Sequence, residues 1–448
     1  MTIEALRELQ ATDEGPSLPD GTSVASLVGP NGSSVSARAL TDPDIYRMEL
    51  ERIFARSWLA VAHESEIPNS GDYVLRSMGE DRVIVSRDAA GGIHILLNSC
   101  RHRGMPVCRA DAGNASQFKC PYHGFTYQSS GEFVGAPVLK KAYGDTLDRS
   151  TMGLVSARSE TYGGMIFGSF DPAAPALRDY LGDMAWYLDL LLARTPGGLE
   201  VIGSPHRFRI RANWKLGSDN FIGDAYHTYT THGFAVNTSQ LPPDPSFAWY
   251  GVQVAAGEGH GLGLTGAPPG VPLPPYLNMP HELIPLMKAT LSAEQDEALR
   301  RTNFIHGTVF PNLSFLNAMI NSEEGQAPLP FVTLRTWIPR GPTEMEVCSW
   351  FLVDKEAPQW FKEVSRLSYV RLFGPSGTFE QDDTEIWTGI TKAVSSQVGS
   401  RQTLHVGMSV DREPDRGDWP GPGDVHQGGY AEIGQRSFWR KWAKELTR

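Results

Sequence analysis

The sequence predicts an α+β protein, with a small antiparallel-β domain followed by a larger domain in which helices flank an antiparallel sheet. Three observations predict this class. The chain has 448 residues, enough for one large domain and a smaller one. From Trp58 to about Phe170, short apolar runs alternate with turn residues, as in an antiparallel β domain. Beyond Val201, helical and strand-like patterns are mixed.

Composition restricts the partners and the compartment. The formal net charge of −11 argues against nucleic acid or an anionic membrane surface as a partner. No apolar run approaches the roughly 18 residues of a membrane span, and the polar, acidic residues 1–14 lack the pattern of a signal peptide. Four cysteines in a chain of this length do not make a disulfide framework, so we expect a reducing cytoplasm.

Residues 1–56 are expected to add an N-terminal arm and a helix to the larger, catalytic domain. Residues 1 to about 40 mix Gly, Ser, Pro and acidic side chains, so we expect them to have little structure of their own. Thr41-Asp42-Pro43 is typical of a helix start, with Thr41 or Asp42 at the N-cap.

The small β domain is expected over residues 57–175. Turn signals separate its predicted strands, which include Tyr73–Leu75, Arg82–Val85 and Ile93–Leu97. The segment Pro172 to Pro175 is expected to link this domain to the larger one.

The larger domain is expected over residues 176–448. It begins with a predicted helix from about Ala176 to Ala193, in which apolar residues recur at helical spacing. Further expected elements are a strand over Phe208–Leu216, a helix begun by the capping box Ser292/Gln295, and a hairpin of Phe331–Pro339 and Glu344–Val353. Gly257 to Pro280 is rich in Gly and Pro and is expected to form a long loop, either at a pocket mouth or on an inert surface.

The stretch from Asp219 to His232 has the outline of a metal site within a segment expected to be helical. His227 and His232 are five residues apart, and Asp224 precedes His227 by three. Two histidines and one carboxylate are the ligand set of non-haem Fe(II) oxygenases. Positions five apart diverge by about 140° on an ideal helix, so both imidazoles reach one ion only if the helix ends or bulges between them. Gly233 is a candidate stop.

Asp224 is a candidate ligand or, alternatively, an acceptor for the ring N–H that a ligating histidine leaves free. The His-x4-His pair alone is weak evidence, because a satisfied pair in the core or on the surface explains it equally well. A second signal is needed.

That signal is a cluster within the small β domain: Cys100-x-His102 and, after seventeen intervening residues, Cys120-x2-His123. Each pair fits one tight loop, and the two loops would face one another across a metal. Two thiolates and two imidazoles hold either a tetrahedral zinc ion or a [2Fe–2S] centre in which two histidines replace two cysteines on one iron. A classical zinc finger pairs Cys with Cys and His with His, so the order of the residues favours the iron–sulfur centre.

The two loop sequences, Cys100-Arg-His102-Arg-Gly and Cys120-Pro-Tyr-His123-Gly-Phe-Thr-Tyr, resemble the Rieske loops of aromatic-ring-hydroxylating oxygenases. Asp219 to His232 resembles their mononuclear-iron helix, and the resemblance extends from Trp58 to about Trp387. It implies the large (alpha) subunit of an oxidoreductase that takes electrons from a reductase, often through a ferredoxin, into the Rieske centre and on to mononuclear Fe(II). In the dioxygenases of this family, both atoms of O2 are added to adjacent ring carbons as a cis-dihydrodiol.

The resemblance also assigns the metal ligands. Cys100 and Cys120 would bind one iron of the cluster, and His102 and His123 the other. His227, His232 and a carboxylate would bind the catalytic iron.

The third ligand of the catalytic iron is expected after Gly374, where the resemblance selects Asp383. The residues alone leave three alternatives open, namely Asp382, Glu380 and Glu385. Asp224 matches the carboxylate that, in the family, bridges a Rieske histidine of one subunit to an iron-ligand histidine of its neighbour.

Catalysis on an aromatic ring needs an apolar cavity beside the iron. The positions that match the family's pocket are Asn220, Phe221, Ala225, Thr228, His306, Leu316, Phe373 and Phe379. Phe221 and Ala225 fit ordinary core packing equally well. The titratable His306 would orient a substituted or carboxylated ring, so the expected substrates are polycyclic or substituted aromatics, aromatic carboxylates included.

The expected assembly is a ring, because two metal centres too far apart within one chain must pair across a subunit contact, and head-to-tail contacts that close make rings. By resemblance, three such chains associate with three copies of a small beta subunit. Two alternatives remain open. One is a Rieske monooxygenase or demethylase that works as a trimer of alpha subunits alone. The other is a non-enzyme, either an iron–sulfur electron carrier or a zinc-stabilised binding module.

Overall fold

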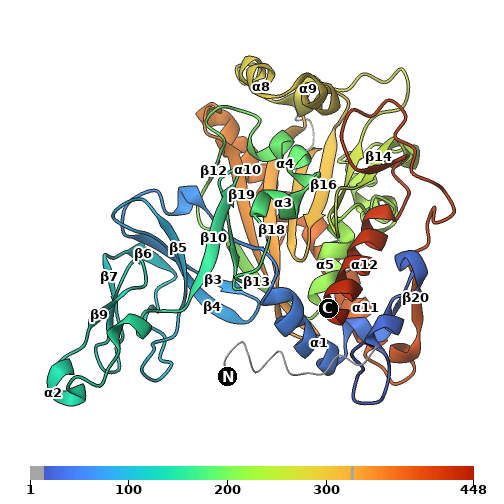
Figure 1. Ribbon diagram of the computed structural model, residues 1–448. Helices are drawn as coiled ribbons and strands as arrows, with labels where there is room; N and C mark the ends of the chain where they lie inside the picture. Colours follow the sequence, from blue (N-terminus) through green and yellow to red (C-terminus); the bar gives the residue numbers. More distant parts are fainter. Residues whose placement is uncertain (1–14, 324–326) are drawn as a thin grey trace.

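The computed structural model describes residues 15–323 and 327–448. It confirms the expected α+β class, because antiparallel sheets are combined with helices that gather around the largest of them (Figure 1). The smaller part lies at the lower left of Figure 1 in blue and teal, and the larger part holds the orange strands. None of the helices in the described residues is long and apolar enough to cross a lipid bilayer.

The smaller part contains a seven-stranded sheet and a separate three-stranded sheet. The strands of the seven-stranded sheet lie in the order β2 (Leu59–His63), β11 (Met165–Ser169), β10 (Ser156–Tyr162), β5 (Ile93–Leu97), β4 (Asp81–Arg87), β3 (Asp72–Met78), β6 (Ala112–Asn114). The other comprises β7 (Gln117–Lys119), β8 (Thr126–Gln128) and β9 (Phe133–Gly135), and the short helix α2 (Leu139–Tyr143) follows it. The two Cys/His loops connect β5 to β6 and β7 to β8, so both leave strand ends of this part.

The larger part is built on a nine-stranded antiparallel sheet. Its order is β12 (Leu199–Val201), β19 (Glu344–Asp354), β18 (Leu329–Gly341), β17 (Leu313–Ile320), β16 (Phe304–Val309), β15 (Gly261–Thr265), β14 (Gly251–Ala255), β21 (Asp424–Gln427), with β13 (His206–Ile210) also paired to β19. The expected hairpin is confirmed as β18–β19, with Arg335 opposite Ser349. The strand expected over Phe208–Leu216 is correct only in part, because β13 ends at Ile210 and residues 214–216 already belong to a helix.

Three helices cover one face of this sheet: α5 (Trp214–Phe221), α10 (Gln359–Phe373) and α11 (Thr378–Val394). Arg335 and Trp337 lie two residues apart on β18 and therefore share that face. The Arg335 guanidinium lies 4.8 Å from the ring centroid of Phe221 on α5, and Trp337 packs edge-on against Trp387 of α11. The strands and these helices thus hold the segment that follows α5 in place.

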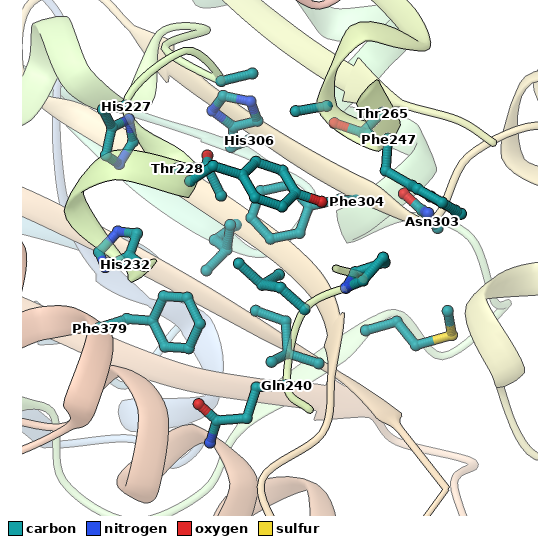
Figure 2. Close-up of a pocket in the computed structure, with 18 of the residues that line it drawn as sticks. His227, Thr228, His232, Gln240, Phe247, Thr265, Asn303, Phe304, His306 and Phe379 are labelled. Carbon is teal, nitrogen blue, oxygen red and sulfur yellow. The ribbon is translucent and has the colours of Figure 1, made fainter. Parts of the chain in front are cut away.

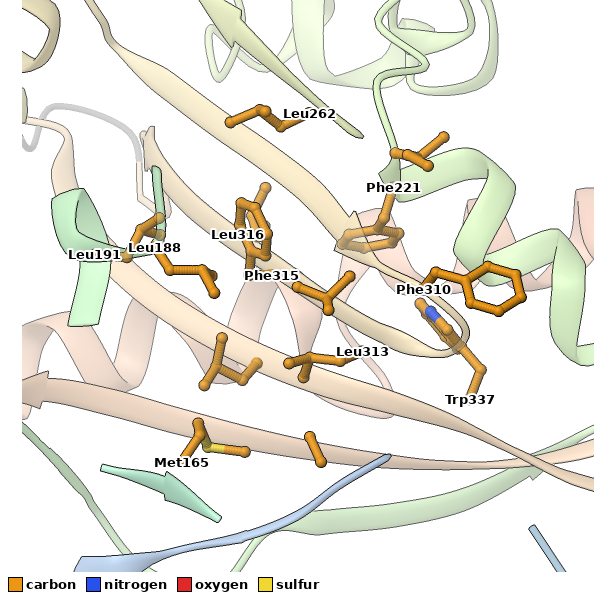
Figure 3. Close-up of a cluster of buried hydrophobic side chains, with 14 of the residues drawn as sticks. Met165, Leu188, Leu191, Phe221, Leu262, Phe310, Leu313, Phe315, Leu316 and Trp337 are labelled. Carbon is orange, nitrogen blue, oxygen red and sulfur yellow. The ribbon is translucent and has the colours of Figure 1, made fainter. Parts of the chain in front are cut away.

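The apolar core is continuous between the two parts. Figure 3 shows Met165 of β11 in the same cluster as Leu188 and Leu191 of α4 (Met184–Leu192) and Leu313 of β17. A second buried cluster lies beneath the Cys/His loops and includes Ile84, Leu96 and Phe118. Burial of this apolar surface is the main force that holds the two parts together.

The N-terminal segment differs from expectation where the structure describes it. Residues 15–40 are packed rather than lacking structure, since Val24, Leu27 and Val35 are buried and β1 (Ser34–Ser36) pairs with β20 (Thr403–His405). Residues 1–14 lie outside the described part. Asp42 is the N-cap of α1 (Pro43–Glu49), as one of the two predicted options, and one π-helical turn (Leu50–Phe54) follows.

A buried ion pair between Glu49 and Lys215 lies where the N-terminal helix α1, helix α5 and the C-terminal helix meet. The Glu49 carboxylate accepts hydrogen bonds from Lys215 Nζ of α5 and from the indole N–H groups of Trp214 and Trp442, at 2.9 and 2.7 Å for the two indoles. Trp442 belongs to the C-terminal helix α12 (Ile433–Thr447). The side chains of Glu49 and Lys215 are fully buried.

Two other expectations are corrected. The helix predicted over residues 176–193 is interrupted at Gly182 (φ 51°), which separates α3 (Leu177–Leu181) from α4. The Gly/Pro-rich segment from Gly257 to Pro280 is a loop only in part, because it contains β15 of the central sheet. A Cβ at Gly263 would lie 2.6 Å from His306 Nε2, so glycine here leaves room for the side chain of a neighbouring strand rather than marking a loop.

The predicted capping box Ser292/Gln295 is confirmed. It begins α9 (Ala293–Arg300), which follows α8 (Ile284–Thr290).

Candidate metal centres and cavity

The segment between the two histidines is not one continuous helix. After α5 ends at Phe221, the chain turns and forms the short helices α6 (Thr228–Thr231) and α7 (Gly233–Asn237). His232 separates α6 from α7 with φ −103° and ψ 36°, so α6 ends at Thr231, two residues before Gly233, the candidate stop, and α7 begins at that glycine. This interruption meets the condition that two histidines five apart must satisfy to reach one ion.

His227, His232 and Asp383 converge. The Nε2 atoms of His227 and His232 lie 3.5 and 3.3 Å from Asp383 Oδ1. One donor atom from each of the three residues lies within 4.8 Å of the others. Asp383 comes from α11, so the sheet-covering helix and the α6 segment together form the group. Two imidazoles and one carboxylate on one side of an ion are the facial set of non-haem iron oxygenases.

Each histidine also contacts a second carboxylate through its other ring nitrogen. His227 Nδ1 lies 3.4 Å from Asp224 Oδ2, and His232 Nδ1 lies 3.3 Å from Asp382 Oδ2. Such outer carboxylates fix the tautomer so that Nε2 is free to bind a metal. Asp382, which sequence reasoning considered only as a rival ligand, therefore lies behind His232, on the side of the ring away from Asp383. Asp224 lies in a turn rather than on a helix face, where its Oδ1 accepts the backbone N–H of His227 at 3.2 Å.

The electrostatics of this group favour a cation. Burial by itself would raise the pKa of Asp383, but the two histidines bring it far below its usual value. Burial would likewise lower the pKa of His227, yet Asp224 and Asp383 raise it well above the usual value. Without a metal, a proton on the His227 imidazole helps to balance the buried carboxylates. A divalent cation would take over that role and leave neutral imidazole ligands.

A cavity of about 530 Å³ opens beside these three residues (Figure 2). All eight residues that the resemblance places in a pocket line it: Asn220, Phe221, Ala225, Thr228, His306, Leu316, Phe373 and Phe379. Its size is in the range of small-molecule sites, and most of its lining is apolar.

Other lining residues were missed by sequence reasoning, among them Tyr229, Gln240, Phe247, Thr265, Asn303 and Phe304. Tyr229 lies on α6 and Phe247 in a 3-10 helix (Pro245–Trp249), whereas the others come from loops and strand ends with no motif around them. Only the register of β15 against β16 could have placed Thr265 beside Phe304.

His306 lies on β16 in the cavity wall. Burial, together with the positive charge of nearby His227, lowers its pKa to about 4, although Asp224 acts against this shift. The imidazole is therefore uncharged near neutral pH. It offers a polar edge but no cation.

The two Cys/His loops share one backbone pattern. In each loop a glycine N–H donates to the cysteine carbonyl, Gly104 to Cys100 at 2.8 Å and Gly124 to Cys120 at 3.0 Å. Both glycines have φ near 70° (74° and 72°), a conformation that L side chains rarely adopt. The loops bring His102 Nδ1 within 3.1 Å of His123 Nδ1, and Cys100 and Cys120 are buried below.

This geometry excludes the zinc alternative for the four residues. Donors around one tetrahedral zinc lie at most about 3.8 Å apart, because Zn–S bonds are about 2.3 Å long. Among the described residues, only the set of His227, His232 and Asp383 has three or more donors all within 4.8 Å. The four cysteine and histidine donors are therefore spread too widely for one ion. A spread of this kind suits two irons, with two nitrogens on one and two sulfurs on the other.

Aromatic side chains surround this second centre. Tyr127 O–H lies 3.2 Å from Cys100 Sγ and accepts the Arg101 N–H at 3.0 Å. Phe125 stacks on the His102 ring, with centroids 4.7 Å apart. His123 and its neighbour Tyr122 are exposed, so the histidine edge of the centre faces the surface.

Comparison with known proteins agrees with both sites. Residues 57–151 match the Rieske [2Fe-2S] domain, and residues 177–447 match the ring hydroxylating alpha subunit (catalytic domain). The chain belongs to the alpha subunits of ring-hydroxylating oxygenases.

Individual relatives of this alpha subunit cover nearly all of it. It is 38% identical to the N,N-dimethyl phenylurea N-demethylase subunit alpha of Sphingobium sp. (strain YBL2), over 90% of each chain. It is 36% identical to the biphenyl dioxygenase subunit alpha of Metapseudomonas furukawaii, over 95% of this chain and 93% of the relative. The crystal structure of naphthalene 1,2-dioxygenase from Rhodococcus sp. bound to indole superposes with a TM-score of 0.90, at 49% identity, over 92% of this chain and 94% of that one.

Membership establishes an enzyme with two cofactors, a Rieske [2Fe–2S] cluster and a catalytic non-haem iron. The convergence of the donor atoms fits both groups. The roles of the individual residues are predictions.

Proposed function

We propose that this alpha subunit cis-dihydroxylates an uncharged aromatic ring. One observation carries the proposal: the set of His227, His232 and Asp383 lies in the wall of a largely apolar cavity of about 530 Å³. Iron held by these three side chains would supply the activation of O2. The protein's own contribution is to hold the ring beside that face, to exclude water with apolar side chains, and to keep both imidazoles in one tautomer through Asp224 and Asp382.

The overall reaction consumes more than the ring and O2. Formation of a cis-dihydrodiol requires the arene, one O2, two electrons and two protons, so an external reductase has to supply the electrons, directly or through a ferredoxin. The exposed His123 and Tyr122 mark the surface at which electrons would pass. Two relatives are named as alpha subunits, which supports the further proposal of a small beta subunit and an assembly of three alpha and three beta chains.

An uncharged substrate suits the cavity better than an aromatic carboxylate. Within the described part of the chain, the residues that line it include no Lys or Arg, while Asp224 and Asp383 are both acidic. His306, which could have paired with a carboxylate, is kept neutral by burial, since its pKa is about 4. A buried anion without a partner is costly, so the expected substrates are neutral.

Oxidative demethylation is the second candidate function. The specific observation in its favour is the 38% identity to an N-demethylase alpha subunit. That reaction would need the same metal ligands, so the ligands do not discriminate between the two outcomes.

The product does discriminate. The alpha subunit, its beta subunit and an electron-transfer chain would be supplied with ¹⁸O2 and a panel comprising naphthalene, biphenyl, an N,N-dimethyl arylurea and benzoate. The proposal predicts a cis-diol in which both oxygens are ¹⁸O and come from one O2, with no turnover of benzoate. Formaldehyde from the arylurea without any diol would establish demethylation instead, and a lack of any oxygenated product would refute both.

A further inference from the structure

The end of the cavity far from the metal ligands carries polar side chains. Figure 2 shows His227 and His232 on one side of the cavity and Thr265 and Asn303 on the other. Thr265 is the last residue of β15, and Asn303 immediately precedes β16. The Asn303 backbone N–H donates to the Thr265 carbonyl at 2.9 Å, so the two residues are fixed side by side.

The orientation of the Asn303 amide follows from its hydrogen bond. Its Nδ2 donates to the Gly266 carbonyl at 3.2 Å, and an amide nitrogen can only donate, so Oδ1 points elsewhere. Oδ1 is buried and has no partner among the described residues. The terminal torsion of an asparagine side chain is broad, so a small rotation presents this oxygen to the cavity. The Thr265 side chain lines the same end of the cavity.

A buried acceptor is unfavourable when left unpaired. The group that would satisfy it is a donor, either O–H or N–H. The surroundings specify that donor further. Phe247 and Phe304 flank this end of the cavity, and none of the described residues that line the cavity is Lys or Arg, so the complementary group is neutral and attached to an apolar frame.

We propose that Asn303, assisted by Thr265, determines substrate specificity by accepting a hydrogen bond from an O–H or N–H group at the end of the substrate remote from the attacked ring. The preferred substrates are then extended aromatic molecules with a neutral donor at that end, such as a phenol or an N–H amide, rather than plain hydrocarbons. This inference rests on the proposed function, since it names the substrate class of the same cavity.

The test is a comparison of matched ligands that bind without turnover. Dissociation constants would be measured on the holoenzyme in the absence of O2 for 4-hydroxybiphenyl, 4-methylbiphenyl and 4-methoxybiphenyl. The methyl compound has nearly the shape of the phenol, and the methoxy compound accepts but does not donate. Wild-type protein should bind the phenol about tenfold more tightly than either analogue, because a site built for a donor discriminates against molecules that lack it.

Variants locate the effect. Asn303→Leu should reduce the preference for the phenol to about onefold, because the acceptor is removed, and Thr265→Val should reduce it in part. Gln240→Leu is the matched control: its Oε1 is also buried without a partner in the cavity wall, but Gln240 lies away from Asn303 in Figure 2. That variant should retain the preference. Circular dichroism and the visible colour of the cluster would establish that each variant is folded.

Equal affinity of the wild-type protein for the phenol and the methyl analogue would overturn the inference without any variant. Retention of the preference in Asn303→Leu, or its loss in Gln240→Leu instead, would overturn the assignment to Asn303. Failure of the proposed function would look different, because then no aromatic member of the series would yield a diol, whatever its affinity.

Discussion

Asp382 and Asp383 are neighbours in the sequence but contact opposite nitrogens of one imidazole. Asp382 Oδ2 lies 3.3 Å from Nδ1 of His232, and Asp383 Oδ1 lies 3.3 Å from Nε2 of the same ring. Asp383 alone also reaches His227. The two adjacent carboxylates therefore have different expected roles, one as a metal ligand and the other as the group that orients a ligand.

The first prediction separates these two roles. Asp383→Ala should lose the mononuclear iron and all product formation while keeping the visible absorption of the cluster, because a ligand is missing. Asp382→Ala should keep the ligand set but weaken iron binding by about 10- to 100-fold, as loss of a carboxylate behind a ligating histidine does. Iron and acid-labile sulfide analysis after dialysis measures both effects. If Asp382→Ala were the variant without iron, the assignment of the ligand would be wrong by one residue.

The second prediction concerns Asp224, whose Oδ2 lies 3.4 Å from His227 Nδ1. By resemblance this carboxylate links the catalytic iron of one subunit to the Rieske histidine of its neighbour. Asp224→Ala should therefore keep both metal sites largely filled but stop oxidation of the reduced cluster during a single turnover. Stopped-flow absorption of the cluster measures this rate. Asp244→Ala, at an exposed helix cap, is the control and should oxidise as fast as wild type; rapid oxidation in Asp224→Ala would refute the role.

The pairing of the two Cys/His loops could be predicted because the pattern is local. Cys100, His102, Cys120 and His123 lie in two short loops whose glycines impose the turn, so residue type and order were enough to group them as candidate ligands. The choice of Asp383 over its neighbour was not predictable from residue type. It depends on how α11 is rotated against the α6 segment, which packing of the whole sheet and its helices determines.

Errors in the sequence analysis arose where tertiary packing overrides a local pattern. The Gly-rich segment around Gly263 was expected to be a loop, but it contains a central strand whose glycines accommodate side chains of the neighbouring strand. The segment from Asp219 to His232 was expected to be helical, but the helix ends at Phe221. The polar end of the cavity at Thr265 and Asn303 could not be found because these residues meet only through strand pairing.

The third prediction concerns pH. His260 is buried, with Nδ1 accepting the Phe310 N–H and Nε2 bonded to the Tyr180 carbonyl, both at 2.9 Å. Burial lowers its pKa to about 4, whereas an unfolded histidine titrates near 6.5. The unfolded state therefore binds the extra proton first, and stability that is fully present above pH 6.5 is lost as the pH falls toward 4.

Chemical denaturation at pH 7, 6, 5 and 4.5 measures this loss. His260→Gln should reduce the decrease in unfolding free energy across that range by roughly 3 kcal/mol, the value of about 2.5 pKa units. His281, whose side chain is 90% exposed, provides the control, and His281→Gln should follow the wild-type curve. Parallel curves for His260→Gln and wild type would show that His260 titrates as it does in the unfolded chain.

The fourth prediction concerns the buried pair that joins α1, α5 and α12. Glu49→Ala would leave the Lys215 ammonium buried without its partner, together with the N–H groups of Trp214 and Trp442. Removal of one partner of a buried ion pair typically costs about 3–5 kcal/mol, because the remaining charge has no compensation. We expect a loss of that size in the free energy of unfolding, and a smaller loss in Glu49→Met/Lys215→Met, in which both charges are removed.

The control for this pair is Glu258, which bonds Lys441 and Lys444 at the surface with 64% of its side chain exposed. Solvent screens such pairs, so Glu258→Ala should cost no more than about 1 kcal/mol. Lys215 lies on α5, the helix that leads into the metal-binding segment, so Glu49→Ala should also release iron at a lower denaturant concentration than wild type. If Glu49→Ala lowered the free energy of unfolding no more than Glu258→Ala does, the buried pair would not be what stabilises the contact of α1, α5 and α12 next to the metal site.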